Sequence, residues 1–384
     1  MNGAPANQGN TGVTIGNSSG ARVVRAELMV ARCALTRPYD LSFVTLNEYV
    51  SVMMRVTLDN GDIGLGECVP LPGYSHETVE SVLNDLKAIL EWVTGRSCAE
   101  LRATLPERLA DSPFAMSAVL TAVDTALVTF PFPPVLSVPM LHPLSARSTP
   151  EQIVGDLQQG WDDGFRTFKL KVGRDVSRDC SATYVILDRL PEGGRLRIDA
   201  NQGYTPSQAR QLADAVRRHP RRALVEVLEQ PLEIAAWDEF EALVSYAPDV
   251  PWMLDESIVF ERDVQRAAAA GARIVKLKLF KHAGITGLLD MARHAADLGL
   301  KVVVGNGVAT DVGNLAEALA VHHGHGLFLG ACEGNGFAKL QRPLLLNGPV
   351  AIKGTLQYLN GAMKKSRWAL REGTYELFEK GEET

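Results

Sequence analysis

The sequence predicts an α/β protein in which an α+β capping domain precedes a parallel (β/α)8-type barrel. Eight short apolar runs end in polar residues, and a helical segment follows each of them except the last, as in such a barrel. The N-terminal part instead places its strands before its helices, which is typical of an α+β unit. Between the two parts lies the proline-rich stretch "PFPPVLSVP", which suits neither a helix nor a central strand and indicates a linker.

The capping domain is expected to span residues 21–135. Residues 21–36 and 47–68 predict strands, and the "DNG" at 59–61 predicts a tight turn within the second stretch. Two amphipathic helices are expected to follow, at residues 76–93 and 112–130.

The barrel is expected to span residues 136–345. Its eight predicted strands are "VPMLH", "RTFKLKV", "RLRIDAN", "LVEVLEQP", "PWMLDES", "ARIVKLKL", "LKVVVGN" and "GLFLGAC". Residues 1–20 are rich in Gly, Asn and Ser and predict a disordered leader. The segment 346–384 falls outside the repeat, and we expect it to pack back on the capping domain.

The composition is that of a globular protein with a small acidic excess. The net charge is −6 and no basic stripe stands out, so a nucleic-acid partner is not expected. The five cysteines occur singly, without metal-ligand or redox spacing, which predicts reduced thiols and a cytoplasmic location. No apolar run is long enough to span a bilayer, and the N-terminus lacks the apolar core of a signal peptide, so no membrane association is expected.

Charged side chains gather at the predicted C-terminal strand ends, where barrels of this kind carry their chemistry. The second strand ends with Lys169 and Lys171, which lie two apart and therefore share a face. The next four strands end with Asp199, Glu229, Asp255 and the pair Lys276 and Lys278. The steps from 171 to 199, 229, 255 and 278 are 28, 30, 26 and 23 residues, each close to one βα repeat. These side chains are therefore expected at similar height around the rim.

The predicted rim combines acids and lysines in a way that suits one chemistry. Three carboxylates on adjacent strands form an all-oxygen site, which favours Mg²⁺, with Mn²⁺ as an option, over zinc or copper. Two lysines side by side in a barrel are costly unless acids lie near them. A divalent ion and ammonium groups stabilise the enediolate that forms when a proton is removed α to a carboxylate. Lysines on both faces of one carbon would permit racemisation or epimerisation.

Five motifs in order resemble the enolase superfamily, in particular its muconate lactonizing enzyme subgroup, of the mandelate racemase/muconate lactonizing enzyme kind. They are "TFKLKVG", "RIDANQGY", "LEQPL", "MLDES" and "VKLKLFKHAGIT". The resemblance covers roughly residues 21–345 and implies a modified (β/α)7β barrel. It also implies the chemistry known for the superfamily, in which a lysine or histidine base acts with Mg²⁺. Capping loops near "LTRPYDLSF" and "PLPGYSHET" would then close over the substrate.

The resemblance also implies roles for individual residues. It makes Lys171 and Lys278 the two acid/base groups, with Lys169 steadying Lys171 and the substrate carboxylate. Glu333, after the last predicted strand, would face that carboxylate. The metal ligands that it implies are Asp199, Glu229 and Asp255.

The chain departs from the family pattern at several positions. Ala283 stands where the family usually has the first of two glycines, and Lys276 is an added inward cation that we expect to pair with a rim carboxylate. The aspartate-x-aspartate pair of dipeptide epimerases is absent, because Glu333 and Asn335 carry only one charge. Asn306 ends strand seven in place of a histidine, which argues against a lysine–histidine dyad.

Simpler roles exist for each residue alone. Asp199 could cap a helix, and Glu229 could be a solvated rim charge. Together, however, these readings require five coincidences along the chain. The histidines of "VHHGHG", which are His322, His323 and His325, precede the last strand at the end away from the site, so we expect a surface loop there and no metal binding.

The sequence therefore predicts an Mg²⁺-dependent enzyme that removes the proton α to a carboxylate. The predicted reaction is that of a racemase, epimerase or cycloisomerase acting on a small acid, such as an N-substituted or cyclic amino acid or a muconate-like acid. One alternative is a dehydratase, which would expel a β-leaving group from the same enolate. Another is a non-catalytic metal-dependent protein that binds small acids. Relatives in this superfamily are usually homo-oligomers, so a homo-oligomer is expected.

Overall fold

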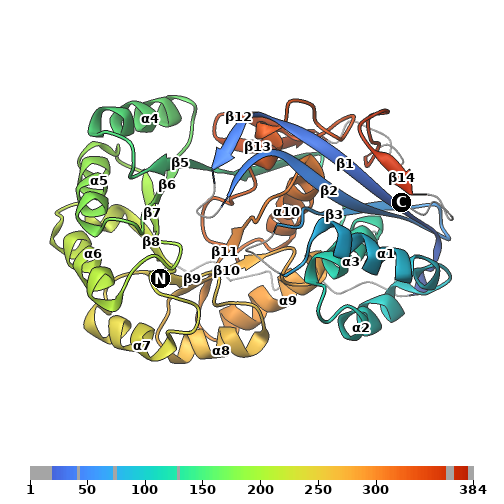
Figure 1. The fold of residues 1–384 in the computed structure, drawn as a ribbon, viewed down its shortest axis with the longest axis horizontal. Helices are drawn as coiled ribbons and strands as arrows, with labels where there is room; N and C mark the ends of the chain where they lie inside the picture. Colours follow the sequence, from blue (N-terminus) through green and yellow to red (C-terminus); the bar gives the residue numbers. More distant parts are fainter. Residues whose placement is uncertain (1–19, 41–43, 72–75, 128–129, 360–366, 379–384) are drawn as a thin grey trace, which may run out of the picture.

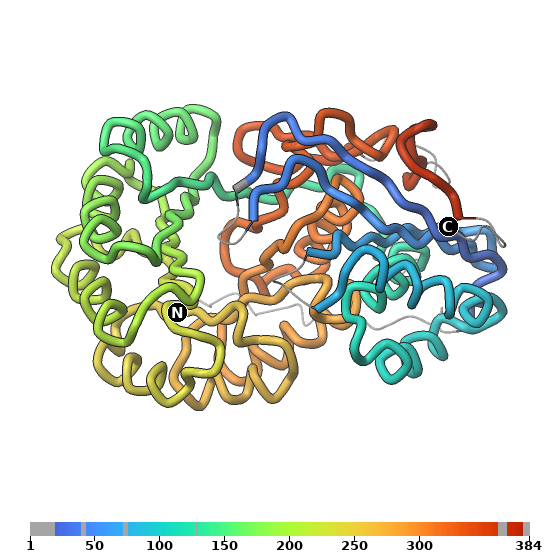
Figure 2. Tube along the Cα trace, in the orientation of Figure 1, coloured from blue at the N-terminus to red at the C-terminus, as the bar shows by residue number. Residues whose placement is uncertain are grey.

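The computed structural model describes residues 20–40, 44–71, 76–127, 130–359 and 367–378. Apart from residue 20, the predicted leader lies outside these residues, as do parts of both predicted capping loops. Figure 1 shows a ring of helices around a curled sheet, with a second, smaller group of strands and helices beside it. The path of the chain through both groups can be followed in Figure 2.

The smaller group is an antiparallel sheet with helices packed on it. Its strands are β1 (Val23–Asp40), β2 (Thr45–Leu58), β3 (Ile63–Cys68) and β14 (Glu376–Phe378), in the order β14-β1-β2-β3. Its helices are α1 (Val79–Val93), α2 (Cys98–Arg108) and α3 (Pro113–Ala126). Helix α3 lies directly on β3 because Gly64 and Gly66 have no side chain. A Cβ at these positions would come within 1.9 and 2.1 Å of backbone oxygens of α3.

The larger group is a parallel sheet whose strands follow one another in sequence order. The strands are β5 (Leu141–Ser145), β6 (Thr167–Lys171), β7 (Arg195–Asp199), β8 (Val225–Glu229), β9 (Trp252–Leu254), β10 (Ile274–Lys278) and β11 (Lys301–Gly305). The helices between and after them are α4 (Pro150–Asp162), α5 (Val176–Arg189), α6 (Pro206–Arg218), α7 (Trp237–Tyr246), α8 (Glu261–Ala269), α9 (Gly284–Asp297) and α10 (Asp311–His323).

Two of these helices begin with the same local signal. Thr149 and Thr205 are N-cap residues, each followed by proline at the first helical position. In both, the threonine hydroxyl accepts from the backbone N–H of the glutamine three residues later, whose side chain accepts from the N-cap N–H. This reciprocal bonding satisfies donors that the first turn leaves open, and proline fixes the backbone there at no cost in hydrogen bonds.

The eighth predicted strand closes the barrel without forming a regular ladder. Residues 328–332 make only isolated parallel bridges, Val302 with Phe328 and Met140 with Cys332, within the described chain. Arg197, which is fully buried, donates from its guanidinium to the backbone oxygens of Leu329 at 3.1 Å and Ala331 at 2.8 Å. The predicted modified (β/α)7β barrel with an α+β cap is therefore confirmed.

The C-terminal segment divides between the two groups. Strands β12 (Val350–Ile352) and β13 (Thr355–Leu359) form a three-stranded sheet with β4 (Val135–Pro139), which the sequence analysis had read as linker. Among the described residues of this segment, only β14 joins the capping sheet, pairing antiparallel with β1. The sequence expectation had placed the whole segment 346–384 against the capping domain.

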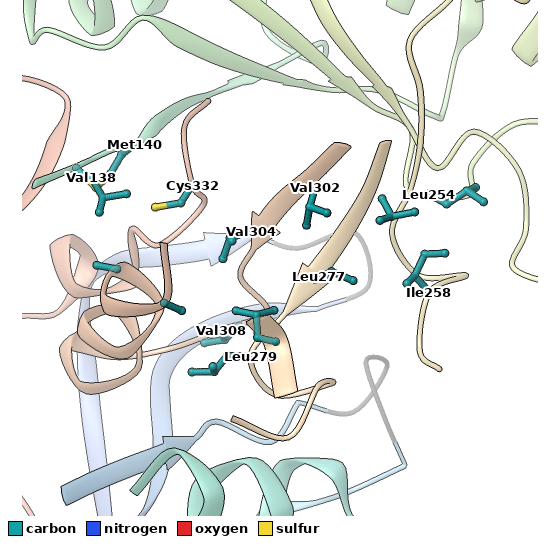
Figure 3. Packing of buried hydrophobic residues seen from close by; sticks show 14 of the residues in the cluster. Val138, Met140, Leu254, Ile258, Leu277, Leu279, Val302, Val304, Val308 and Cys332 are labelled. Carbon is teal, nitrogen blue, oxygen red and sulfur yellow. The ribbon is translucent and has the colours of Figure 1, made fainter. Parts of the chain in front are cut away.

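The main hydrophobic core lies between the barrel strands and the helices around them. Figure 3 shows part of it, with Leu277 and Leu279 from the β10 region, Val302 and Val304 from β11, and Cys332 from the closing segment. Each of these side chains is no more than 5% exposed. No helix in the described part of the chain is long and apolar enough to cross a membrane.

Candidate active site

The register of the parallel strands brings the predicted residues to one end of the barrel. Lys171 lies beside Asp199 in the pairing of β6 with β7, and Asp199 lies beside Glu229 in the pairing of β7 with β8. Further along the same sheet, Lys278 lies beside Gly305 at the ends of β10 and β11. Because parallel strands end at the same edge, these side chains meet around one opening.

Lys169 is buried at the centre of the cluster. Its ammonium nitrogen lies 2.8 Å from Asp199, 3.0 Å from Glu229 and 2.7 Å from Glu333. Burial disfavours the charged ammonium group, but the three carboxylates outweigh burial and raise the pKa of Lys169 well above its ordinary value. Lys169 is therefore a fixed cation that holds the acids together.

Lys171 reaches one of these acids, Asp199, from a more open position. Its side chain is 48% exposed, and its Nζ lies 2.5 Å from Asp199 and donates to Asn201 Oδ1 at 2.8 Å. Burial opposes the charge of Asp199, yet Lys169 and Lys171 hold the pKa of this carboxyl group well below its usual range. Of the two lysines on β6, only Lys171 combines an acidic contact with substantial exposure.

Lys276, which the sequence analysis had expected to be a rim partner, is fully buried inside the barrel. Its Nζ forms a short ion pair with Glu229 and lies 2.8 Å from Glu333 and 3.4 Å from Asp255. Lys276 thus touches two of the three carboxylates that were predicted to bind metal.

Lys278 stands on the opposite side of the opening from Lys171. Its Nζ lies 2.8 Å from Asp255 Oδ1, and its side chain is 3% exposed. Lys281, which the sequence analysis had not singled out, donates to the backbone oxygens of Asp255 at 3.1 Å and Ile258 at 3.2 Å. Burial lowers the pKa of Lys281 to about 8 despite the attraction of Asp255.

The pKa values of the buried acids are shifted in different directions by their surroundings. Burial, followed by the negative charge of Asp199, raises the pKa of Glu229 to about 8, although Lys169 and Lys276 act against this. Burial likewise raises the pKa of Glu256, next to Asp255. For Asp255 itself, burial is outweighed by its lysine neighbours, first Lys278, and its pKa lies well below the usual range.

The three predicted metal ligands fit a hard divalent cation by their chemistry. Asp199 and Glu229 end β7 and β8, and Asp255 directly follows β9. Each of these carboxylates is no more than 3% exposed, and such oxygens are the ligands that Mg²⁺ and Mn²⁺ prefer. Their oxygens are directed to ammonium groups, however. Among the described residues, no three His, Cys, Asp or Glu side chains are arranged around a common point that could hold a metal.

The cluster forms the floor of a pocket of about 730 Å³, including its open mouth. Its floor includes Lys169, Lys171 and Lys278, and its walls include Glu333, Tyr39, Tyr49, Asn306, Asn335 and Lys339. The sequence analysis had not found Lys339, which lies on the short helix η3 (Gly336–Lys339) beyond the closing segment. Its only signal was its place six residues after Glu333.

The histidine cluster lies elsewhere. His322 and His323 form the last turn of α10, and His323 Nε2 lies 3.0 Å from the backbone oxygen of Pro131. Neither lines the pocket.

Comparison with known protein families identifies the family of the chain. Residues 152–359 match the model of the family described as enolase C-terminal domain-like. The chain belongs to this family.

Relatives of this chain include epimerases, racemases and a muconate cycloisomerase, together with an o-succinylbenzoate synthase. The chain is 29% identical over 318 residues to an L-Ala-D/L-Glu epimerase of Bacillus subtilis, covering 77% of this chain and 84% of the relative. It is 26% identical over 323 residues to a muconate cycloisomerase of Acinetobacter lwoffii, covering 77% and 80%. The predicted class, an isomerase of the enolase superfamily, is thus confirmed, and members of that superfamily bind Mg²⁺.

A solved structure agrees with the observed fold of this enolase-family chain. The muconate lactonizing enzyme from Pseudomonas fluorescens superposes with a TM-score of 0.75 at 24% identity, covering 92% of this chain and 97% of that one. At this identity the likeness concerns the arrangement of barrel and cap.

Proposed function

We propose that the chain catalyses removal and return of the proton α to a carboxylate in a small acid, as a racemase or epimerase. The observation that carries this proposal is that Lys171 on β6 and Lys278 on β10 line one pocket, with three strands between them in the sheet. A carbon held between them faces an ammonium or amine nitrogen on each side. Such a pair removes a proton from one face and returns one to the other.

The remaining charged residues have supporting roles in this proposal. Lys169, which shares Asp199 with Lys171, steadies Lys171 and the substrate carboxylate. Glu333, 2.7 Å from Lys169, faces that carboxylate. Asp199, Glu229 and Asp255 would hold Mg²⁺ or Mn²⁺, which when bound supplies positive charge to the enediolate oxygens. The buried ammonium groups of Lys169 and Lys278 add to this stabilisation, because charges that are screened little by water act more strongly.

Three alternatives to this proposal use the same pocket. A cycloisomerase or a dehydratase would form an enolate intermediate closely related to the proposed one. A non-catalytic binding protein would need only the pocket. A cycloisomerase would give a rearranged product, and a dehydratase would give new olefinic protons. A binding protein would take up the acid without exchanging any proton. All three alternatives are separable by the same measurement.

The measurement is proton NMR in D₂O with Mg²⁺ on single enantiomers of small N-acyl amino acids and dipeptides. We expect loss of the α-proton signal together with inversion of the centre. Lys171→Ala and Lys278→Ala should each abolish inversion, while each retains exchange for the enantiomer whose proton faces the remaining lysine. Lys301→Ala, an exposed lysine at the opposite end of β11, serves as the control and should behave as the unmodified chain.

Normal inversion in both lysine variants would overturn the assignment of the acid/base pair. If calorimetry shows that compounds bind but none of them exchanges its α-proton, the proposed reaction is overturned. A non-catalytic binding protein is then the remaining interpretation.

A further inference from the structure

The loops that follow β6 and β7 pack backbone against backbone. Gly173 comes two residues after Lys171, and its φ of 104° is one that a Cβ disfavours. A Cβ added at Gly173 would lie 2.2 Å from the backbone oxygen of Ala200, and one at Gly203 would lie 2.1 Å from that of Gly173. The loop after Lys171 and the loop after Asp199 are therefore in direct contact.

One buried carboxylate binds both loops. Asp179, in the first turn of α5, accepts at Oδ2 from the backbone N–H of Gly173 at 2.9 Å and from the hydroxyl of Tyr204 at 2.6 Å. Asp179 is 3% exposed and Tyr204 is 4% exposed. Hydrogen bonds to an ionised acceptor are short and strong. Burial, together with the Asp179 carboxylate, raises the pKa of Tyr204, so its hydroxyl remains a donor.

The loop after β7 contains strained backbone and touches Lys171. Asn201 and Gln202 have φ values of 43° and 66°, in the left-handed region that residues with a Cβ rarely adopt. Such conformations persist only where the surrounding contacts hold them, and they often occur at functional sites. Asn201 Oδ1 accepts from Lys171 Nζ at 2.8 Å. The hydrogen bond from Tyr204, two residues beyond this strained pair, is thus a contact that keeps Asn201 against the lysine.

These contacts lie on the side of only one of the two proposed acid/base lysines. Lys171 belongs to β6, whereas Lys278 belongs to β10, with three strands between them in the sheet. The ammonium group of Lys278 lies 2.8 Å from Asp255, across the opening. A change at Asp179 or Tyr204 is therefore expected to reach Lys171 and to leave Lys278 in place.

We propose that Asp179 and Tyr204 are positioning residues for Lys171. Their hydrogen bond holds the two loops together, and Asn201 then holds the ammonium group of Lys171 toward one face of the reacting carbon. This proposal rests on the proposed function, in which Lys171 and Lys278 serve opposite faces. Without the hydrogen bond, proton transfer by Lys171 is slowed, while proton transfer by Lys278 continues.

The test is Tyr204→Phe, which removes only the hydroxyl. The probes are the two enantiomers of N-acetylalanine, N-acetylleucine and N-acetylphenylalanine, and loss of their α-proton signal is followed in D₂O with Mg²⁺. Lys278→Ala first shows which enantiomer gives its proton to Lys171. In Tyr204→Phe, exchange of that enantiomer should slow by about ten-fold or more, because a small misplacement of a reacting group is costly. The other enantiomer should keep its rate within about two-fold.

Two further variants separate positioning from general damage. Tyr184→Phe removes a hydroxyl of α5 that donates to the backbone oxygen of Ala215 at 3.0 Å, and both enantiomers should exchange as in the unmodified chain. Asp179→Asn keeps an oxygen that can accept from Tyr204, so it should retain more of the Lys171-dependent rate than Tyr204→Phe does. Loss of folded protein would lower the rates of both enantiomers equally.

Equal slowing of both enantiomers in Tyr204→Phe, or no slowing of either, would overturn the positioning role, while exchange in the unmodified chain still supports the proposed function. If the unmodified chain exchanges no α-proton, the proposed function fails for these acids. Reductive methylation of Lys171, followed by mass spectrometry, then decides the positioning role without any substrate. Faster methylation in Tyr204→Phe than in Tyr184→Phe keeps the role, because an amine released from its acceptor loses its proton more readily. An unchanged rate overturns it.

Discussion

Lys276 brings a positive charge to carboxylates that the proposed metal ion would need. Its ammonium contacts Glu229, Asp255 and Glu333 inside the barrel. Five lysines, at 169, 171, 276, 278 and 281, lie in this region of the barrel together with five acids, at 199, 229, 255, 256 and 333. A divalent ion entering this cluster must displace ammonium groups from its ligands, which weakens its binding.

Replacing Lys276 by methionine should therefore tighten Mg²⁺ binding. We expect the dissociation constant measured by titration calorimetry to fall by about ten-fold, which is the size of one displaced ion pair in a partly screened site. Lys301→Met is the matched control, because it removes a lysine charge far from the cluster. Weaker or unchanged binding in Lys276→Met would show that this lysine does not oppose the metal.

The positions of the charged residues at the barrel rim were the most predictable part of the site. Lys169, Lys171, Asp199 and Glu229 could be placed together because each ends an apolar run and the runs repeat at a nearly constant interval. Lys339 could not, because it lies on a short helix after the last run, where no periodicity sets its direction. Its place in the pocket depends on hydrogen bonds to β1, about 300 positions earlier in the sequence.

Helix α9 begins with a backbone conformation that its sequence does not suit. Its N-cap residue, Ala283, has φ 57° and ψ 49°, in the left-handed region where a Cβ is strained. Glycine adopts this conformation without that strain, but it would lose the contacts of one methyl group packed at the edge of the capping core.

Ala283→Gly should raise the free energy of unfolding by about 0.5 kcal/mol, because the relief of strain exceeds the lost contacts. The measurement is urea denaturation, with Ala267→Gly in the interior of α8 as the control. That change should destabilise the chain by about 1 kcal/mol or more, since glycine is unfavourable within a helix and Ala267 is fully buried. Destabilisation by Ala283→Gly of the same size as the control would contradict the strain at α9.

The sequence predicted helices and strands that have a local residue pattern of their own. It missed strands whose identity depends on a partner far along the chain. The run 326–332 looks like the other barrel strands, but Gly326 and Gly330 have positive φ and interrupt the extended backbone. The stretch 135–139 contains an alternation of exposed and buried residues, yet the prolines around it indicated a linker. Its partner β13 lies more than 200 residues later, so nothing local identified the pairing.

At the scale of the whole molecule, two buried carboxylates of the cap bind the first turns of barrel helices. Glu67 on β3 accepts from the backbone N–H groups of Thr310 at 2.6 Å and Gly313 at 2.9 Å, at the start of α10. Asp124 on α3 accepts from the backbone N–H of Thr286 at 2.8 Å, in the first turn of α9. Negative charge is favourable at helix N-termini, so both contacts join cap to barrel.

We expect the unmodified chain to unfold in one calorimetric transition that includes both groups of elements. Glu67→Ala and Asp124→Ala should each lower the free energy of unfolding by about 2–4 kcal/mol, because buried N–H groups lose their acceptor. Glu48→Ala removes a carboxylate from an exposed ion pair with Arg32 and should change the free energy by less than about 0.5 kcal/mol. Two separate transitions in the unmodified chain would show that these contacts do not couple cap and barrel.

The pairing of β1 with β14 also sets the order in which the sheet is completed during synthesis. Leu28 pairs with Phe378, 350 positions later. At roughly 5–20 residues per second, the ribosome releases β14 on the order of 20–70 seconds after β1. Throughout that interval the outer edge of β1 in the nascent chain lacks its native partner, and an open strand edge is a site for pairing with other chains. The strand that is made first is thus among the last to receive its full set of backbone partners.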